Sequence, residues 1–229
     1  ANIINTMCEE IAADIEALTE GRVFLRILSN LTDRSVVKAR VIIPTEKLEG
    51  KSYPGEEVRD GIILASQFAE VDPYRAATHN KGIMNGIDPL AVATGNDWRA
   101  IEASAHAYAA RSGTYSSLSR WYANDAGDLV GTIEIPIKVG ITGGSLKANG
   151  TTMISYRLLK VDSAKELAEL MAAVGLAQNF SAIKALSTEG IQKGHMSLHA
   201  RSVAVTAGAP KEIFETVVSH LIDQGKITV

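Results

Sequence analysis

Two glycine-punctuated clusters of charged and amide residues carry the residue types needed to polarise a carbonyl group. The clusters cover residues 72–86 and 95–100, and together they contain Arg75, Lys81, Asn85 and Asp97. A cationic donor beside a carboxylate can hold a carbonyl oxygen and stabilise the alkoxide that forms from it. The two clusters therefore indicate a catalytic site for an oxygen that gains negative charge.

A third cluster, residues 190–195, ends on His195, whose side chain can transfer a proton near neutral pH. His199 follows four residues later, a spacing that would let both imidazoles face one metal ion from a helix. The residues between them lack the glutamate of a zinc protease motif, and no third ligand is evident nearby. The pattern therefore favours a proton-transferring histidine over a metal ligand.

Each of these residues also has a purely structural interpretation. A lysine such as Lys81 is most often a solvated loop residue, and Asp97 is well placed to cap a helix. Arg75 and Asn85 could be ordinary hydrogen-bonding residues of a loop, and His195 could be a core or capping histidine. Residue types and spacing alone leave both interpretations open.

The overall composition is that of an ordinary globular protein. The 229 residues are 46% hydrophobic and 21% charged, and the formal net charge of −3 gives no basic footprint for nucleic acid. Cys8 is the single cysteine, which excludes an intrachain disulfide and a cysteine metal cluster and fits a reducing, cytoplasmic setting. No apolar run approaches the roughly 20 residues that a membrane span requires.

The periodicity of apolar residues predicts interspersed helices and strands, and hence an α+β or mixed fold. Helices are expected over residues 6–18, 56–70, 96–111, 163–174, 178–186 and 195–205, with a last helix that starts at Pro210. Strands are expected over residues 23–28, 34–43, 130–138 and 151–159. Pro136 in the third strand suggests an edge or a bulge, because proline cannot donate to a β-ladder.

Three motifs, in the order in which they occur, resemble those of the bacterial, class II hydroxymethylglutaryl-coenzyme A reductases. They are the clusters within residues 72–100, the run Val139-Gly-Ile-Thr-Gly-Gly-Ser145 and the run Ala185-Leu-Ser-Thr-Glu-Gly-Ile-Gln-Lys-Gly-His-Met-Ser-Leu198. The class I pattern lacks the run seen here from Leu198 to Arg201, which favours class II. The resemblance covers essentially the whole chain.

This resemblance implies roles for individual residues. Lys81 is expected to hold the carbonyl oxygen, Asp97 to sit beside this lysine and tune its proton transfer, and His195 to protonate the departing coenzyme A thiolate. The substrate-binding residues are expected to be Arg75, Asn85, Gln178 and Leu186. Asn2 is the one residue assigned to the coenzyme, and no metal is expected.

The implied reaction is the reduction of 3-hydroxy-3-methylglutaryl-coenzyme A to mevalonate and coenzyme A with two nicotinamide hydrides, or its reverse. The coenzyme is expected to be NADH or NADPH, and the sequence does not select between them. The family also uses a glutamate as an acid and a nicotinamide-binding domain, both expected mostly upstream of Ala1. Because family members are dimers with sites at the subunit interface, a homodimer or higher homo-oligomer is expected, with no nucleic acid or membrane partner.

The resemblance also predicts how the chain is divided. Residues 1–29 would end a small coenzyme-binding domain, which makes the chain the C-terminal half of a reductase rather than a complete protein. Residues 30–189 would form a large substrate-binding domain. Residues 190–229 would form a mobile helical flap, hinged at Gly190 and Gly194, that carries His195 onto the site. The rival functions are a non-catalytic chain that keeps the substrate pocket and an unrelated chain that binds coenzyme A esters.

Overall fold

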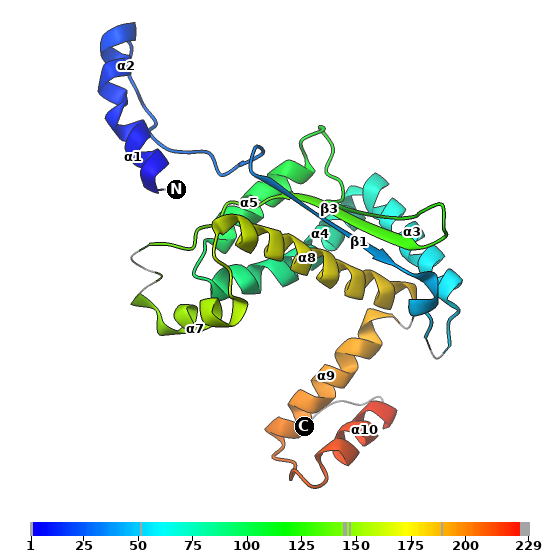
Figure 1. Ribbon diagram of the computed structural model, residues 1–229. Coiled ribbons are helices and arrows are strands. Elements are labelled where there is room, and N and C mark those ends of the chain that lie inside the picture. Colours follow the sequence, from blue (N-terminus) through cyan, green and yellow to red (C-terminus); the bar gives the residue numbers. More distant parts are fainter. Residues whose placement is uncertain (1, 51, 144–145, 147, 189, 225–229) are drawn as a thin grey trace.

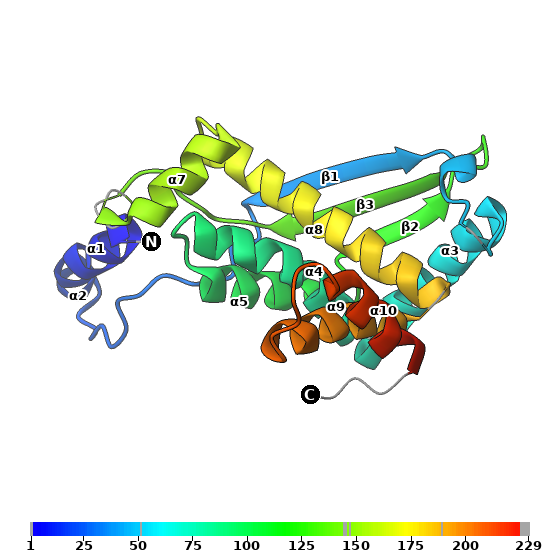
Figure 2. The ribbon, with the colours of Figure 1, turned by 90° about the horizontal axis from the view of Figure 1, so that it is seen from below.

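The fold is a small antiparallel sheet with helices packed on one side of it (Figures 1 and 2). A computed structural model describes residues 2–50, 52–143, 146, 148–188 and 190–224; the side chains of Asn2 and of residues 191–198 lie outside the described part. In Figure 2 the strands form the upper layer, and helices α4, α5 and α8 lie on the lower side. The α+β expectation is confirmed.

The sheet has the order β1-β3-β2. Strand β1 (Val36–Ile43) pairs antiparallel with β3 (Leu129–Pro136), which in turn pairs with β2 (Ser119–Ala123). The prediction that the strand around Pro136 lies at an edge is wrong, because β3 is central. Pro136 is tolerated because it is the last residue of that strand, where a missing N–H costs little.

Four helices form the layer beneath the sheet. They are α3 (Gly55–Val71), α4 (Pro73–Ala93), α5 (Trp98–Ala109) and α8 (Ala164–Ser187), and a short 3₁₀ turn η1 (Thr45–Lys47) leads from β1 to α3. Their apolar faces and the inner face of the sheet share one core, in which Ile62, Ile83, Ile135 and Met171 are fully buried. Burial of this core is the main source of stability for the layer.

Capping residues fix where these helices begin. The side chain of Asp72 accepts a hydrogen bond from the amide of Arg75 at the start of α4, with Pro73 as the first helical residue. The side chain of Ser163 accepts from the amide of Glu166, whose carboxylate in turn accepts from the amide of Asp162 (2.7 Å). The helix that starts at this cap continues to Ser187, so the predicted helices at 163–174 and 178–186 are parts of one 24-residue helix, α8.

The cluster at residues 72–86 is helical, although the glycines suggested a loop. Residues Pro73–Ala93 form one 21-residue helix that includes Gly82, Gly86 and Pro89. A Cβ at Gly86 would lie 2.9 Å from Cβ of Gln178 and 3.1 Å from the carbonyl oxygen of Val174, both on α8. Gly86 is thus required for close helix packing rather than for a turn.

Two predicted strands are wrong. Residues 151–159 lie in helix α7 (Gly150–Leu159), because the side chain of Asn149 caps its first amides and starts a helix there. Residues 23–28 pair with no strand among the described residues. Instead, the amides of Val23 and Leu28 donate to the side chains of Glu16 (2.8 Å) and Asn5 (2.9 Å).

The two ends of the chain form separate helical pairs. Helices α1 (Asn2–Glu10) and α2 (Ala12–Thr19) replace the single helix expected at 6–18 and stand apart from the main body (Figure 1). Helices α9 (Ile191–Thr206) and α10 (Phe214–Gln224) project from the end of α8 and share their own small core around Ala200, Ala204 and Val218. The predicted domain division and the mobility of the flap both stay predictions.

Details of the C-terminal pair correct two further expectations. Gly190 precedes α9 with φ +82°, but Gly194 lies inside that helix and does not mark a second hinge point. The last helix starts at Phe214 rather than Pro210, because residues 211–213 form turns. Within the described part of the chain, no helix is long and apolar enough to cross a membrane.

Candidate active site

One cavity, of about 440 Å³, brings most of the expected site residues together between α4 and α8. Helix α4 contributes Arg75, Thr78, His79, Lys81, Gly82 and Asn85, and α8 contributes Gln178, Asn179, Ser181, Ala182, Ile183, Ala185 and Leu186. Five of the eight residues assigned from the sequence therefore line a single pocket: Arg75, Lys81, Asn85, Gln178 and Leu186. We call it the α4–α8 pocket.

Helical spacing explains why these side chains converge. Arg75, Gly82 and Asn85 recur on α4 at steps of seven and three residues, which places them on one face of the helix. The two helices run antiparallel, since His79 contacts Asn179 whereas Ile87, farther along α4, contacts Gly175, which lies earlier along α8. Gly86 of α4 and Gly175 of α8 lie at this contact. Glycine at both contact points lets the two backbones approach closely and brings the polar rows of both helices to the same opening.

The electrostatics of the pocket favour an anion. Arg75 is half-buried, and burial lowers the pKa of its guanidinium from its usual value. Lys81 is exposed at the rim. None of the described residues lining the pocket is acidic, and neither cation forms an ion pair with a described carboxylate. A carboxylate-bearing ligand would supply the missing negative charge, and the guanidinium can bind it in a bidentate fork.

Asp97 lies outside this pocket. Its exposed side chain caps α5 by accepting a hydrogen bond from the amide of Ala100 (3.1 Å). From Lys81 to the end of α4 at Ala93 the helix rises roughly 18 Å, which puts Asp97 beyond the reach of the lysine. The expectation that Asp97 and Lys81 lie side by side is therefore not met within one chain.

Two expected site residues cannot be placed by their side chains. His195 belongs to α9 and Asn2 to α1, but the side chains of both lie outside the described residues. Their roles as thiolate acid and coenzyme contact stay predictions.

The glycine-rich motif is tied to the turn before Asp97. The side chain of Asn96 accepts from the amide of Gly140 (2.8 Å) and donates to its carbonyl oxygen (3.1 Å). The hydroxyl of Tyr156 on α7 donates to the carbonyl oxygens of Thr94 and Gly140, both at 3.1 Å. These bonds fix the position of α5's first turn, and the sequence motif alone did not reveal them.

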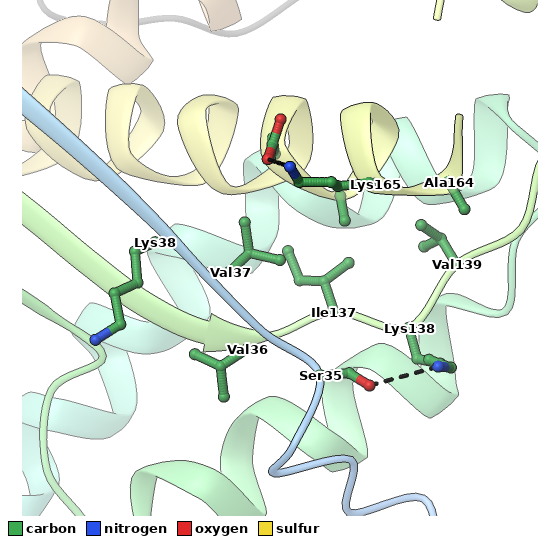
Figure 3. A pocket seen from close by; sticks show the side chains of 11 residues that line it. Ser35, Val36, Val37, Lys38, Ile137, Lys138, Val139, Ala164 and Lys165 are labelled. Atoms are coloured by element: carbon green, nitrogen blue, oxygen red, sulfur yellow. Dashed lines mark hydrogen bonds and ion pairs between the residues drawn. The ribbon is translucent and has the colours of Figure 1, made fainter. Parts of the chain in front are cut away.

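A second, smaller cavity of about 320 Å³ lies between β1 and the first turns of α8 (Figure 3). Val37, Ile137 and Val139 form its apolar wall, and its lysines are Lys38, Lys138 and Lys165. Lys165 pairs with Glu169 (3.6 Å), and Lys138 lies 3.5 Å from the hydroxyl of Ser35. It contains none of the eight site residues assigned from the sequence, so the α4–α8 pocket is the better candidate.

A titratable cluster lies farther along α4, toward α5. Burial raises the pKa of Asp88 to about 7, and a hydrogen bond to Glu102 and the charge of Glu102 act in the same direction. Glu102 also lies 2.6 Å from Nε2 of His106, whose Nδ1 lies 2.6 Å from the hydroxyl of Tyr115. The cluster joins α4 to α5 but does not line the α4–α8 pocket.

The α4–α8 pocket carries groups that suit an anionic ligand, and comparison with known proteins identifies the family of the chain. A family model described as hydroxymethylglutaryl-coenzyme A reductase matches residues 1–200. The chain belongs to the hydroxymethylglutaryl-coenzyme A reductase family, as the sequence motifs predicted.

Individual relatives agree with this assignment. A 3-hydroxy-3-methylglutaryl-coenzyme A reductase of Archaeoglobus fulgidus is 52% identical over 227 residues, which are 99% of this chain and 51% of the relative. A class II reductase of Streptococcus pneumoniae, solved bound to NADPH in open conformations, superposes with a TM-score of 0.79 at 48% identity, covering 97% of this chain and 54% of that one. Another structure of a reductase from S. pneumoniae gives a TM-score of 0.80 at 47% identity, with 97% and 53% covered. The chain thus spans about half the length of the relatives it matches.

Proposed function

We propose that this chain provides the substrate side of a reductase that converts 3-hydroxy-3-methylglutaryl-coenzyme A to mevalonate and coenzyme A, or runs the reverse oxidation. The observation that carries this proposal is the convergence of Arg75, Lys81, Asn85, Gln178 and Leu186 in one pocket that holds two cations and no described acid. Family membership supplies the substrate, and the pocket supplies groups that suit a carboxylate and a carbonyl.

Each of these residues is proposed to contact a different group of the ligand. Arg75 binds the free carboxylate of the hydroxymethylglutaryl group, since a planar guanidinium matches a carboxylate in charge and shape. Asn85 and Gln178 present amides that can donate to and accept from the tertiary hydroxyl and the carbonyl. Leu186 offers the apolar surface that the methyl group requires. Together they orient the thioester toward Lys81.

Lys81 stabilises the charge that develops during reduction. A nicotinamide coenzyme, NADH or NADPH, supplies the hydride when bound, and Asn2 is the residue of this chain proposed to contact it. The ammonium group of Lys81 holds the thioester oxygen as it becomes an alkoxide, an effect that acts on the transition state more than on substrate binding. His195, carried on α9, gives a proton to the coenzyme A thiolate as it leaves.

Among the described residues of one chain, no carboxylate pairs with Lys81, which supports the proposal of a homodimer. Asp97 is exposed at the start of α5 and is not consumed by an ion pair in the described part of the chain. We propose that Asp97 of a second copy reaches Lys81 across a subunit interface. Since the proposed substrates are metabolites of the cell interior, we also propose a cytoplasmic location.

The test is the reduction of 3-hydroxy-3-methylglutaryl-coenzyme A, followed as loss of the reduced nicotinamide absorbance with NADH and with NADPH. Lys81→Ala should lower kcat by ~10²–10³, the typical effect of removing one group that stabilises a developing oxyanion. Lys165→Ala is the matched control, because Lys165 is an exposed lysine paired with Glu169 outside the pocket. Equal activity of the two variants would show that Lys81 does not act on the oxygen.

A second candidate is a chain that binds the coenzyme A ester without reducing it. This candidate is supported by the α4–α8 pocket, whose groups suit binding of the ligand whether or not it is reduced. Calorimetric binding of 3-hydroxy-3-methylglutaryl-coenzyme A together with no consumption of either coenzyme would support it.

A further inference from the structure

Four buried side chains form a hydrogen-bonded chain beneath the α4–α8 pocket. They are His79 of α4, Ser119 and Trp121 of β2, and Asn179 of α8, with exposed fractions between 1% and 3%. His79 and Asn179 also line the pocket. These hydrogen bonds therefore connect strand β2, through α8, to α4, the helix that carries Arg75 and Lys81.

The indole of Trp121 fixes the orientation of the Asn179 amide. Nε1 of Trp121 is a donor only, so the Asn179 atom 2.7 Å away must be the acceptor oxygen Oδ1. The amide nitrogen Nδ2 of Asn179 then faces Nε2 of His79 at 3.1 Å. Because Nδ2 can only donate, Nε2 of His79 must accept, and the ring proton must sit on Nδ1.

The hydroxyl of Ser119 can donate or accept, so it fits either tautomer of His79, and the Asn179 amide decides between them. This hydroxyl lies 2.9 Å from Oδ1 of Asn179 and 2.7 Å from Nε2 of His79, so in the Nδ1–H tautomer its single hydrogen has both acceptors within reach. A proton on Nε2 of His79 would instead face the N–H of Asn179. Burial lowers the pKa of His79 to about 4, and the positive charge of Arg75 acts in the same direction, so the imidazole is neutral at pH 7.

The neighbour of this neutral imidazole is the guanidinium proposed to bind substrate. Arg75 precedes His79 by one helical turn on α4, and both line the pocket. Nδ1 of His79 is buried and has no hydrogen-bond partner among the described residues. The histidine is thus held from the Nε2 side only, by residues of the sheet and of α8.

We propose that Trp121, acting through Asn179, holds His79 as the neutral Nδ1–H tautomer and thereby keeps α4 aligned with α8 so that Arg75 faces the pocket. His79 and Asn179 are then positioning residues for the guanidinium, and they need not touch the substrate. The substrate part of this inference rests on the proposed function, whereas the tautomer and the alignment follow from the buried hydrogen bonds alone.

The tautomer can be measured directly by NMR of the purified protein labelled with ¹⁵N-histidine, in which His79→Gln identifies the His79 signals. Long-range ¹H–¹⁵N correlations should show the Nδ1–H form, with no protonation between pH 8 and about pH 5.5. In Asn179→Asp a carboxylate accepts where the amide donated, so the proton should move to Nε2. An Nε2–H tautomer in the unmodified protein, or titration near pH 6.5, would overturn the proposal.

The positioning role is measured by calorimetric binding of 3-hydroxy-3-methylglutarate. Asn179→Asp should weaken binding about tenfold or more, the effect of disturbing one charge-assisted hydrogen bond. Trp121→Phe, which keeps the ring and removes the N–H that orients Asn179, should weaken binding in the same direction and guards against a misfolded aspartate variant. The surface variant His220→Gln should stay within about twofold of the unmodified protein, because His220 is exposed on α10 and the Asn179–His79 bond remains.

The outcomes separate the two levels of proposal. Unchanged binding in both Asn179→Asp and Trp121→Phe would overturn the positioning role. Normal binding of 3-hydroxy-3-methylglutarate without reduction of the thioester would overturn the proposed function and leave the positioning role standing. A failure of the unmodified protein to bind 3-hydroxy-3-methylglutarate would overturn the positioning role for this ligand, while the NMR result would still decide the tautomer.

Discussion

A half-buried guanidinium is costly unless an anion pairs with it, and Arg75 has no carboxylate partner among the described residues. The sequence pointed to Arg75, Lys81 and Asn85 because cation and amide types recur within one short run. It did not point to His79 or Asn179, since a buried histidine and asparagine leave no pattern that separates them from solvated ones. Only the contacts that β2 makes with both helices bring these two side chains into one hydrogen-bonded set.

His195 has a role that kinetics can separate from hydride transfer. A thiolate leaves poorly without its proton, whereas an aldehyde has no leaving group to protonate. His195→Gln should therefore slow reduction of the thioester by ~10²–10⁴ and slow reduction of mevaldehyde much less. Parallel assays of the two substrates make the measurement. If both rates fall equally, the histidine has a structural or shared proton role.

Asp88 should make stability depend on pH. Its pKa is about 7 in the fold and near 3.8 when unfolded, so the folded chain keeps a proton that the unfolded chain loses. The contribution of this proton to the free energy of unfolding is fully present below about pH 4 and is lost as pH rises through 7. Asp88→Asn removes the dependence, so its melting temperature should rise relative to the unmodified protein between pH 5.5 and pH 8. Asp125→Asn, in the exposed turn between β2 and β3, is the control and should show no such trend.

At the scale of elements, the α4–α8 contact determines the shape of the pocket. Gly86→Ala should destabilise the protein and weaken ligand binding, because its methyl group would press on Gln178 and on the carbonyl oxygen of Val174. Gly82→Ala is a matched control on the same helix, where a Cβ meets no atom within 4 Å, and it should stabilise by up to about 1 kcal/mol through helix propensity. Thermal unfolding of the two variants would contradict this account if both shifted in the same direction.

Helices and strands with capping residues and a clear periodicity of apolar residues were predictable from the sequence. Features that depend on contacts with residues distant in sequence were not. Asp97 and Ser163 marked the starts of α5 and α8 correctly, because a cap acts within its own turn. Residues 151–159 read as a strand from their β-branched content, and the cap at Asn149 outweighed that preference. The alignment of α4 with α8 depends on contacts about 90 residues apart in sequence, which no local pattern encodes.

At the scale of the whole molecule, the separation of Asp97 from Lys81 predicts a site shared by two copies. Lys81→Ala and Asp97→Ala should each abolish most activity. Mixing and reassociating the two inactive proteins should restore about a quarter of it, since about half of random dimers are mixed and each holds one intact site. No recovery after confirmed subunit exchange would place both residues in the same copy.

The fluorescence of the two tryptophans reports separately on the region around Asp97 and on the buried hydrogen bonds around His79. Trp121 is 1% exposed among the side chains that hold His79, whereas Trp98 is 43% exposed and directly follows Asp97. Iodide, which cannot enter a packed core, should quench the red-shifted emission of Trp98 and leave the blue-shifted emission of Trp121 intact. If a second copy covers Asp97, quenching should fall as protein concentration rises, and Trp98→Phe should remove that change. Quenching that is independent of concentration across the dimerisation range would place the subunit interface elsewhere.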